Sequence, residues 1–408
     1  MNQIVMVFRY GPWLSPARIR RVATCVAVGT VLCLFFLAAT AHGLSDYSGR
    51  PLGTDFSSFY AAGRLVQLGS NPYEPGALHA MQQRIFGAGT PYYGFAYPPF
   101  FLLLARPLAM LPYLLSLAVW QAGTFAIYLS AMTLLKRRFG QTLPDGLFYL
   151  CAAAFTAVFV TLTHGQNGFL TAALFAAGLA SLGIRPWLAG LCFGFVAYKP
   201  QFGVLIPFAL AAGAHWRSFA AAVVTVLALI GICTLWLGAP IWAEFLKAAG
   251  LSQSMILDSG AVGYAKMVSV FAWLRLWHFP LAVAYIGQAI AALLIIVESA
   301  RLWRSDADPR LQGAALCVGA LLATPFALDY DLMLLAPAIA LLAGYEIQCR
   351  SIPFGASLLA VLWLMPLFAR SIATLTLIPL TSWILIACFV AIMKQAASRD
   401  FGWGVAKG

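Results

Sequence analysis

Charged residues are scarce in this chain of 408 residues. Lys, Arg, Asp and Glu make up 9% of it, whereas a soluble globular domain contains about 25%. Hydrophobic residues make up 62%. Even a large soluble fold leaves about a quarter of its chain surface in water, and so few charges cannot cover such a surface. The composition therefore excludes a soluble domain, and the aromatic content of 14% excludes a disordered chain.

Several motifs of soluble enzymes are also missing. The eight cysteines form no CxxC pair and the five histidines are scattered singly, so neither a disulfide framework nor a zinc site is indicated. No HExxH, Walker loop or dinucleotide fingerprint is present. The 25 basic residues outnumber the 13 acidic ones, which gives a net charge of +12. In a membrane protein this excess indicates the positive-inside bias, so no nucleic-acid partner is expected.

Long apolar runs are what the chain has instead. We predict an all-α polytopic membrane protein with about 12 transmembrane helices (roughly 10 to 13), forming one domain over residues 1–408. Some runs are short, which is tolerated where a span borders protein or a wet cavity. The runs are residues 22–41, 113–135, 147–163, 169–184, 187–197, 202–213, 219–237, 281–300, 311–325, 332–345, 354–368 and 373–393.

Basic clusters set the expected orientation. The first run follows Arg18, Arg20 and Arg21, and the second ends before the basic cluster 136–138. The first run could be read as a signal peptide, but it is longer than the usual hydrophobic core of about 7–15 residues. We therefore expect an uncleaved anchor. With an even number of spans, both termini are expected on the cytoplasmic side.

Two polar segments are expected on the extracytoplasmic side. The first, residues 43–112, should contain short helices at 56–68 and 77–86 and an interfacial helix at 98–111. The second, residues 238–280, reads as amphipathic interfacial helices, with tryptophans at the level of the headgroups. Loops of this length inside a compact protein are usually functional.

Polar side chains collect where the predicted spans end on this outer side. Ionisable groups so close to the apolar boundary are costly and are therefore functional candidates. We expect them to form one outward-facing site, roofed by the two outer segments. The candidates are Asp55, Arg64, Tyr97, His164, Gln166, Asn167, Lys199, Gln201, Asp329 and Asp331.

These residue types suit a group transfer. A carboxylate can take a proton from an acceptor hydroxyl. A cation such as Lys199 can stabilise the charge on a leaving phosphate, and Tyr97 offers a surface for a sugar. The donor would then be a phosphate-activated group carried on a lipid. Because three carboxylates are expected on the outer side, a requirement for a divalent cation is not excluded.

Each candidate also has a structural alternative. Asp55 is one of the residue types that commonly cap the N-terminus of a helix. Lys199 could extend to the membrane surface, and Gln166 and Asn167 could serve a turn. Asp329 and Asp331 could form ion pairs or helix caps.

Two other function classes remain open at this point. A transporter or lipid flippase usually has its site near the bilayer midplane and repeated halves, neither of which the sequence indicates. A non-catalytic scaffold is the other alternative.

Five segments of the chain resemble glycosyltransferase family 87. They are GTDFSSFYAAGRLVQLGSNPYEP at 53–75, FAYPPFFLLLARPLAMLP at 95–112, HGQNG at 164–168, AYKPQFGVLIP at 197–207 and ATPFALDYDLMLLAP at 323–337. Members of this family are bacterial membrane enzymes of the GT-C superfamily, typified by polyprenyl-phosphate-mannose-dependent mannosyltransferases. The segments occur in order over most of the chain.

The resemblance implies a GT-C fold in the bacterial inner membrane. It implies an inverting transfer of a hexose, with mannose preferred, from a polyprenyl-phosphate donor to a lipid or glycan acceptor on the extracytoplasmic face. No metal or other cofactor is implied. Asp55 matches the catalytic base of the family, while Lys199 and Arg64 are expected at the donor phosphate and the remaining candidates at the substrates. Members often carry histidines where this chain has Asp329, Tyr330 and Asp331.

Overall fold

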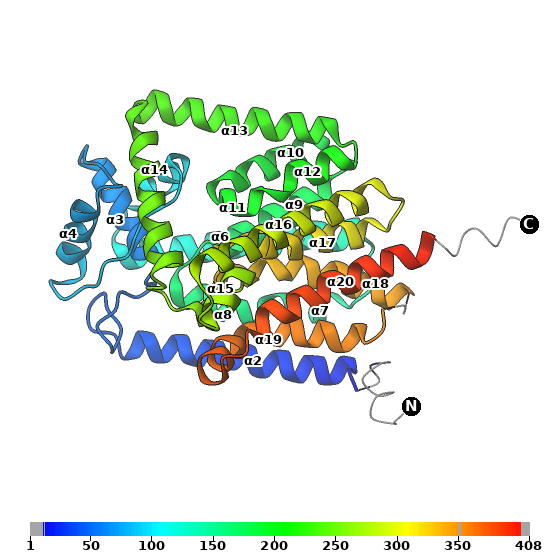
Figure 1. Cartoon of the computed structure of the whole chain (residues 1–408). Helices are drawn as coiled ribbons and strands as arrows, with labels where there is room; N and C mark the ends of the chain where they lie inside the picture. The colour runs from blue at the N-terminus through cyan, green and yellow to red at the C-terminus, as the bar shows by residue number, and fades with distance from the viewer. Residues whose placement is uncertain (1–10, 12, 350–351, 401–408) are drawn as a thin grey trace, which may run out of the picture.

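The chain folds into a bundle of helices that run roughly side by side. The computed structural model describes residue 11, residues 13–349 and residues 352–400. Within these residues there is no β-strand beyond three isolated backbone bridges, which confirms the all-α prediction. Figure 1 shows the long helices lying from left to right, with shorter helices gathered at the left end.

Seven of the described helices are long and apolar enough to cross a membrane. An eighth crossing results if α7 (Asp145–Ala153) and α8 (Thr156–His164), which meet at a bend of 44°, are taken as one span. The protein is therefore polytopic. The seven are α2 (Pro16–Ala39), α6 (Tyr113–Arg138), α13 (Trp216–Leu237), α16 (Leu281–Arg304), η5 (Asp329–Leu334) continued by α18 (Leu335–Cys349), α19 (Gly355–Thr376) and α20 (Leu380–Asp400).

The remaining apolar segments form shorter helices. They are η1 (Pro99–Phe101) with α5 (Leu102–Leu108), α9 (Gly168–Ser181), α10 (Pro186–Phe195) with η2 (Val196–Tyr198), α11 (Pro200–Gly203) with α12 (Leu205–Ala212), and α17 (Pro309–Leu322). Almost every residue of α9 and α17 is buried. Neighbouring helices enclose them, so they need not match the bilayer thickness. The total of twelve spans stays a prediction.

Several predicted helix boundaries are wrong, and three of them change where charged residues lie. The first helix begins at Pro16, because Ser15 caps it and Pro16 fits its first turn, so Arg18, Arg20 and Arg21 lie inside α2. The tenth apolar run begins at Asp329 with a 3-10 turn. The outer turn between the last two helices lies at residues 377–379, because α19 continues to Thr376.

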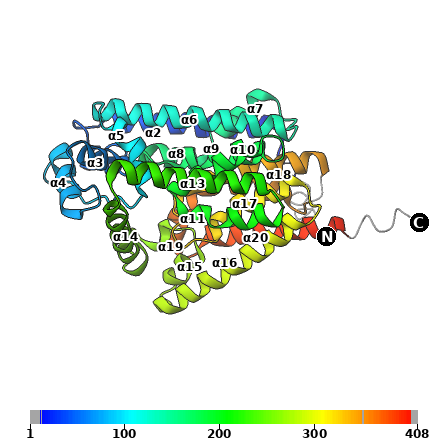
Figure 2. The same ribbon diagram turned by 90° about the horizontal axis from the view of Figure 1, so that it is seen from above.

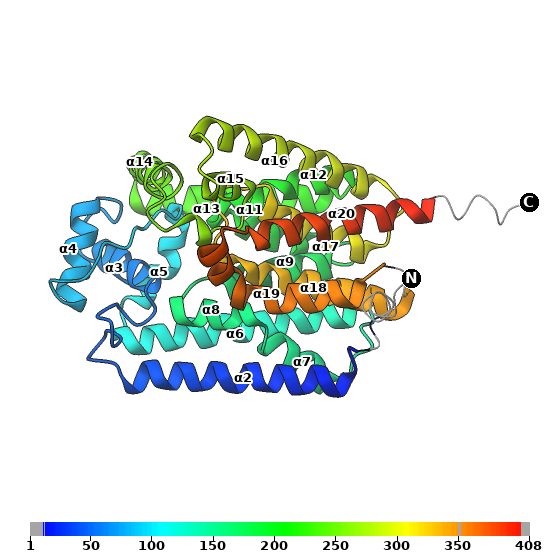
Figure 3. The same ribbon diagram turned by 60° about the horizontal axis from the view of Figure 1, so that its bottom comes forward.

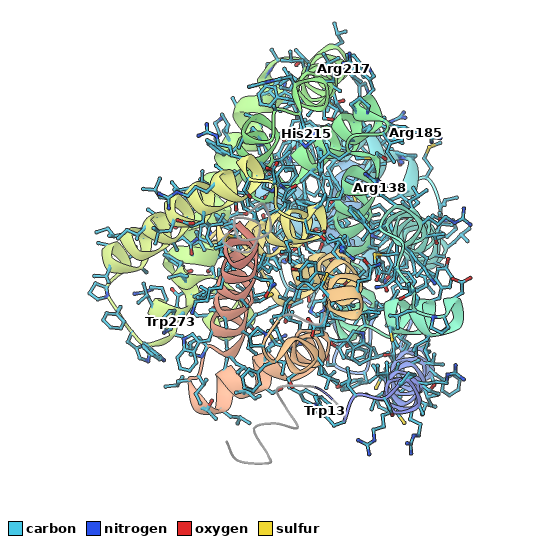
Figure 4. The ribbon with its side chains drawn as sticks, turned by 90° about the vertical axis from the view of Figure 1, so that its right-hand side faces the viewer. Trp13, Arg138, Arg185, His215, Arg217 and Trp273 are labelled. Atoms are coloured by element: carbon cyan, nitrogen blue, oxygen red, sulfur yellow. The ribbon has the colours of Figure 1, made fainter. Side chains whose placement is uncertain are left out.

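The two ends of the bundle differ in character. The start of α2 and the end of α20 lie at the same end, on the right of Figure 1. Figure 4 looks onto this end, where Arg138, Arg185 and Arg217 are labelled. This arrangement fits an even number of passes through the bundle. The first and last residues of the chain lie outside the described residues.

The two polar segments that were predicted to be extracytoplasmic, residues 43–112 and 238–280, lie at the opposite end and are called the first and second outer segments below. The first contains α3 (Phe56–Gln67) and α4 (Pro75–Phe86), so both predicted short helices are confirmed, and the expected helix at 98–111 is η1 with α5. The second contains α14 (Pro240–Gln253), a π turn η3 (Ser254–Asp258), η4 (Tyr264–Lys266) and α15 (Val270–Leu276). Figures 2 and 3 show α3 and α4 beside α14 at this end, and Asn71 Nδ2 donates to Glu244 Oε2 at 3.0 Å between them.

A glycine sets the close packing of α3 on α5. A Cβ atom built on Gly63 would lie 2.2 Å from the Ala105 carbonyl oxygen and 2.8 Å from the Ala109 Cβ atom. Such a contact cannot be relieved by rotating a side chain, because one of the atoms belongs to the backbone. The first outer segment can therefore reach its position only with glycine here.

We expect Gly63→Ala to lower the melting temperature of the purified protein. Gly→Ala in a helix normally stabilises by about 0.5–1 kcal/mol. At Gly63 the clash with α5 outweighs that gain. Thermal unfolding in detergent micelles measures the effect.

Gly123→Ala in α6 is the matched control, since nothing lies within 4 Å of its added methyl group. It should leave the melting temperature unchanged or raise it slightly. Equal behaviour of the two variants would contradict the packing described here.

Candidate functional site

Asp55 lies at the N-terminus of α3, but its side chain does not cap that helix. Its backbone N–H donates to the His164 carbonyl oxygen at 2.9 Å. Its half-buried carboxylate accepts a hydrogen bond from Gln166 Nε2, also at 2.9 Å. The N-cap alternative therefore does not account for this carboxylate, which is directed at the HGQNG turn instead.

The HGQNG turn joins α8 to α9, and its two glycines allow other segments to approach. Gly165 has a left-handed backbone (φ +65°), and a Cβ there would lie 2.6 Å from Phe56 Cβ. A Cβ on Gly168 would lie 2.9 Å from the Tyr330 carbonyl oxygen. The turn thus brings together the start of α3 and η5, which are far apart in the sequence.

Gln166 connects Tyr97 to Asp55. Its Oε1 atom accepts from the Tyr97 hydroxyl at 3.3 Å and from the Asn167 backbone N–H at 3.0 Å. A carboxylate only accepts, so the amide must turn its Nε2 atom toward Asp55. Burial and the carboxylates of Asp331 and Asp55 hold the pKa of the Tyr97 hydroxyl above its ordinary value. Tyr97 therefore stays protonated.

The aromatic ring of Tyr97 is held on two sides. Phe101 stacks on it with ring centroids 4.7 Å apart, and Phe59 meets it edge-on at 5.2 Å. Phe101 also stacks on Tyr198, the residue before Lys199. The aromatic cluster therefore links the Asp55 side of the site to the Lys199 side.

Lys199 and Asp331 form a buried ion pair. Lys199 Nζ lies 2.5 Å from Asp331 Oδ1, and the two residues are only 3% and 4% exposed. The second oxygen of Asp331 accepts from the Leu328 backbone N–H at 3.0 Å. Lys199 occupies the break between η2 and α11, which Pro200 enforces. The alternative that Lys199 extends to the membrane surface is therefore wrong. The alternative that Asp331 forms an ion pair is confirmed.

Tyr330 lies between two lysines. Its ring centroid is 5.3 Å from Lys199 Nζ and 5.4 Å from Lys266 Nζ, and the His164 ring is 6.0 Å away. Lys266 belongs to η4 in the second outer segment and makes no ion pair with any carboxylate of the described residues. From the sequence, Lys266 was expected only in an interfacial segment. No motif marks it.

Asp329 lies on the other side of Tyr330. One carboxylate oxygen accepts from the Tyr330 backbone N–H at 2.9 Å, and the other lies 3.6 Å from an Arg370 nitrogen. Arg370 was not among the predicted site residues, because the predicted apolar run ends at residue 368. The extra turns of α19 bring this arginine to η5.

Two predicted site residues lie outside this network. Arg64 is nine residues after Asp55, which is about 13 Å along a helix, and it donates to Gln67 at 2.9 Å. Gln201 lies in α11, is half-buried, and makes no hydrogen bond or ion pair within the described part of the chain. Their expected contacts with the donor phosphate and the substrate remain predictions.

Asn167 and His164 complete the turn. Asn167 is fully buried, and within the described residues its side-chain amide makes no hydrogen bond of ordinary geometry, although it lies close enough to the Tyr97 hydroxyl to lower the pKa of that group. Unpaired buried amides are costly, so a polar residue here is typical of a functional constraint. His164 Nδ1 lies 2.9 Å from the Val160 carbonyl oxygen. This nitrogen must carry the proton, because a carbonyl only accepts.

No three or more His, Cys, Asp or Glu side chains in the described part of the chain lie close enough together to hold a metal ion.

Comparison with known proteins adds the family. Residues 95–325 match the model of glycosyltransferase family 87. The chain belongs to this family. The matched range contains Tyr97, the HGQNG turn, Lys199 and Lys266, while Asp55 and η5 lie outside it. This family 87 chain is therefore a membrane glycosyltransferase, as its resemblance to the family predicted.

One curated relative is a polyprenol-phosphate-mannose-dependent alpha-(1-2)-phosphatidylinositol pentamannoside mannosyltransferase from Mycobacterium tuberculosis (strain CDC 1551 / Oshkosh). It is 27% identical over 260 residues, which cover 61% of this chain and 56% of the relative. The match thus spans little more than half of the length of that protein. No solved structure matches the chain.

We expect the single substitutions Lys199→Gln and Asp331→Asn each to destabilise the protein strongly. Removing one partner of a buried pair leaves an uncompensated charge, which costs about 3–5 kcal/mol. The double variant should lose less than the sum of the two. The free energies of unfolding of all three variants, measured in detergent, give the coupling energy between Lys199 and Asp331.

The pair between Lys136 and Asp145 is the control, because the Asp145 side chain is 81% exposed. Lys136→Gln and Asp145→Asn should each change stability by less than about 1 kcal/mol. Additive losses at Lys199 and Asp331 would show that the two charges do not depend on each other.

Proposed function

We propose that this glycosyltransferase moves a hexose, with mannose preferred, from a polyprenyl-phosphate donor to a lipid or glycan acceptor. The observation that carries the proposal is the Asp55 carboxylate. It is free of helix capping, oriented by Gln166, and adjacent to Tyr97. The donor class is supported by the mycobacterial relative, which is described as polyprenol-phosphate-mannose-dependent.

Asp55 acts as the general base in this proposal. The acceptor hydroxyl donates a hydrogen bond to the carboxylate and attacks the anomeric carbon from the face opposite the phosphate. The new bond joins the acceptor oxygen to the sugar, the bond from the sugar to the phosphate breaks, and the hydroxyl proton passes to Asp55. Polyprenyl phosphate leaves and the anomeric configuration inverts. Gln166 fixes the carboxylate during this step.

The donor phosphate is placed beside Tyr330. Lys199 was predicted to bind it, but its charge is already compensated by Asp331. Lys266 approaches the same ring and has no carboxylate partner among the described residues. We therefore assign the direct phosphate contact to Lys266, while Lys199 holds η5 in position and contributes a more distant positive potential.

The site is assigned to the extracytoplasmic face of a bacterial inner membrane. The basic end of the bundle would then face the cytoplasm, in agreement with the positive-inside bias. Twelve spans and a GT-C fold belong to the same proposal. The reaction needs no metal in this mechanism, because basic side chains stabilise the leaving phosphate.

Asp55→Asn should abolish transfer while leaving the fold intact. Removing a general base costs about 10²- to 10⁴-fold in rate. The assay offers a panel of polyprenyl-phosphate sugars and a membrane lipid extract to the protein in nanodiscs. It measures donor consumption and the anomeric configuration of the product.

Asp46→Asn is the matched control, since that outer carboxylate caps the turn of Ser48 and Arg50. It should keep the wild-type rate within a few-fold. Full activity of Asp55→Asn, or a product of retained configuration, would overturn the mechanism. Donor flipping without any consumption would favour a transporter.

Lys266→Gln should raise the KM for the donor by about 10-fold or more. A hydrogen bond to a charged group contributes about 1.5–3 kcal/mol. Lys247→Gln is the control, because this exposed lysine of the same outer segment pairs with Glu244. Steady-state kinetics with the donor identified above compare the two. Equal effects would show that only the net charge of the outer face matters.

A further inference from the structure

An apolar groove lies between α2 and the rest of the bundle, at the end opposite to Asp55. Its volume is about 520 Å³, within the range of small-molecule sites. Its walls come from α2, α7, α18 and α19, which lie in the lower part of the bundle as drawn in Figure 1. The lining is hydrocarbon almost throughout and includes Val22, Ala23, Leu147, Ile339, Trp363 and Leu364.

Two arginines line the basic end of this groove. Arg18 and Arg21 are three residues apart on α2 and therefore lie on one face of the helix, with Ile19 and Val22 beside them. Neither forms an ion pair with a carboxylate of the described residues, and the guanidinium of Arg18 donates to the Trp13 carbonyl oxygen at 2.9 Å. Arg20 is also exposed but is not part of the lining.

The position of α2 leaves room for a ligand. Ala23 is the one described residue of α2 that is buried, so this helix makes little direct contact with its neighbours. Trp13 stands at the same end of the groove, and Figure 4 shows it beside the start of α2. Tryptophan at this level is typical of the lipid headgroup region.

The positions of the two arginines and of the hydrocarbon lining indicate which kind of ligand fits the groove. The cations lie in the first two turns of α2 and the hydrocarbon surface follows toward the middle of the helix, about 8 Å from Arg18 at Ala23. A phospholipid has the same order of groups, with an anionic phosphate at the boundary and acyl chains toward the bilayer centre. Basic sites between transmembrane helices are known to bind anionic headgroups.

We propose that this groove binds one anionic phospholipid. Its phosphate lies on Arg18 and Arg21, and one acyl chain fills the space between α2 and α19. The lipid then supplies the contacts that hold α2 against the bundle. This site is separate from the Asp55 end, and the proposal does not depend on the transferase reaction.

The test compares phosphatidylglycerol with phosphatidylcholine of the same acyl chains. Delipidated full-length protein is titrated with each lipid in detergent, and retained lipid is counted by native mass spectrometry. The wild type should retain one phosphatidylglycerol in preference to phosphatidylcholine. Arg18→Gln and Arg21→Gln should each weaken this retention about five-fold, the effect expected for one basic residue near an anionic lipid.

Two variants keep the test decisive. Arg20→Gln removes the same charge at the same depth outside the groove, and it should retain the lipid like the wild type. Ala360→Phe keeps both arginines but fills the groove from α19, and it should lose retention of either lipid. Equal losses in Arg20→Gln and Arg21→Gln, or unchanged retention in Ala360→Phe, would overturn the proposal.

Discussion

The buried ion pair between Lys199 and Asp331 is the interaction on which the outer end of the bundle depends. It fastens the break between η2 and α11 to η5, two segments that are 132 residues apart. Both charges lie in a low-dielectric interior, where each compensates the other. If one segment moved away, the other would keep an uncompensated buried charge, which is strongly destabilising. The ion pair thereby positions Tyr330 in η5. Gly168 lets the HGQNG turn pack closely against Tyr330, and Gly165 lets the start of α3, with Asp55, pack closely against that turn.

The arrangement separates two tasks that both need charge. Asp55 keeps an accessible carboxylate because Gln166, and not a cation, supports it. A lysine at position 166 would instead place a positive charge against this carboxylate, as Lys199 does against Asp331. The positive charges gather instead around Tyr330, where negative charge would develop on a leaving group. Neutral support on one side and cations on the other suit a reaction in which a proton and a phosphate depart in different directions.

Much of this architecture could be predicted from the sequence, and the limits have physical causes. Apolar runs and basic clusters gave the polytopic all-α class, and Asp55, Tyr97, Gln166, Lys199 and Asp331 were all assigned to one end. Counting successive spans predicts the end of the bundle at which a residue lies, but it does not predict which helices are neighbours there. The pairing of Lys199 with Asp331 and the positions of Lys266 and Arg370 therefore required the structure. Helix ends shifted where a cap outside the apolar run, such as Ser15, extended the helix into polar sequence.

The short buried helix α17 has a consequence for how the protein is made. With 14 residues it is too short to cross the hydrocarbon alone, and α12, α16, α18 and α20 enclose it. During synthesis, α20 begins 58 residues after the end of α17 and is complete only at Asp400, and until then α17 lacks a complete protein environment. A chain that stops before α20 would leave this helix open to quality-control proteases. Helix α20 thus completes the protein environment of α17, although it lies far from Asp55.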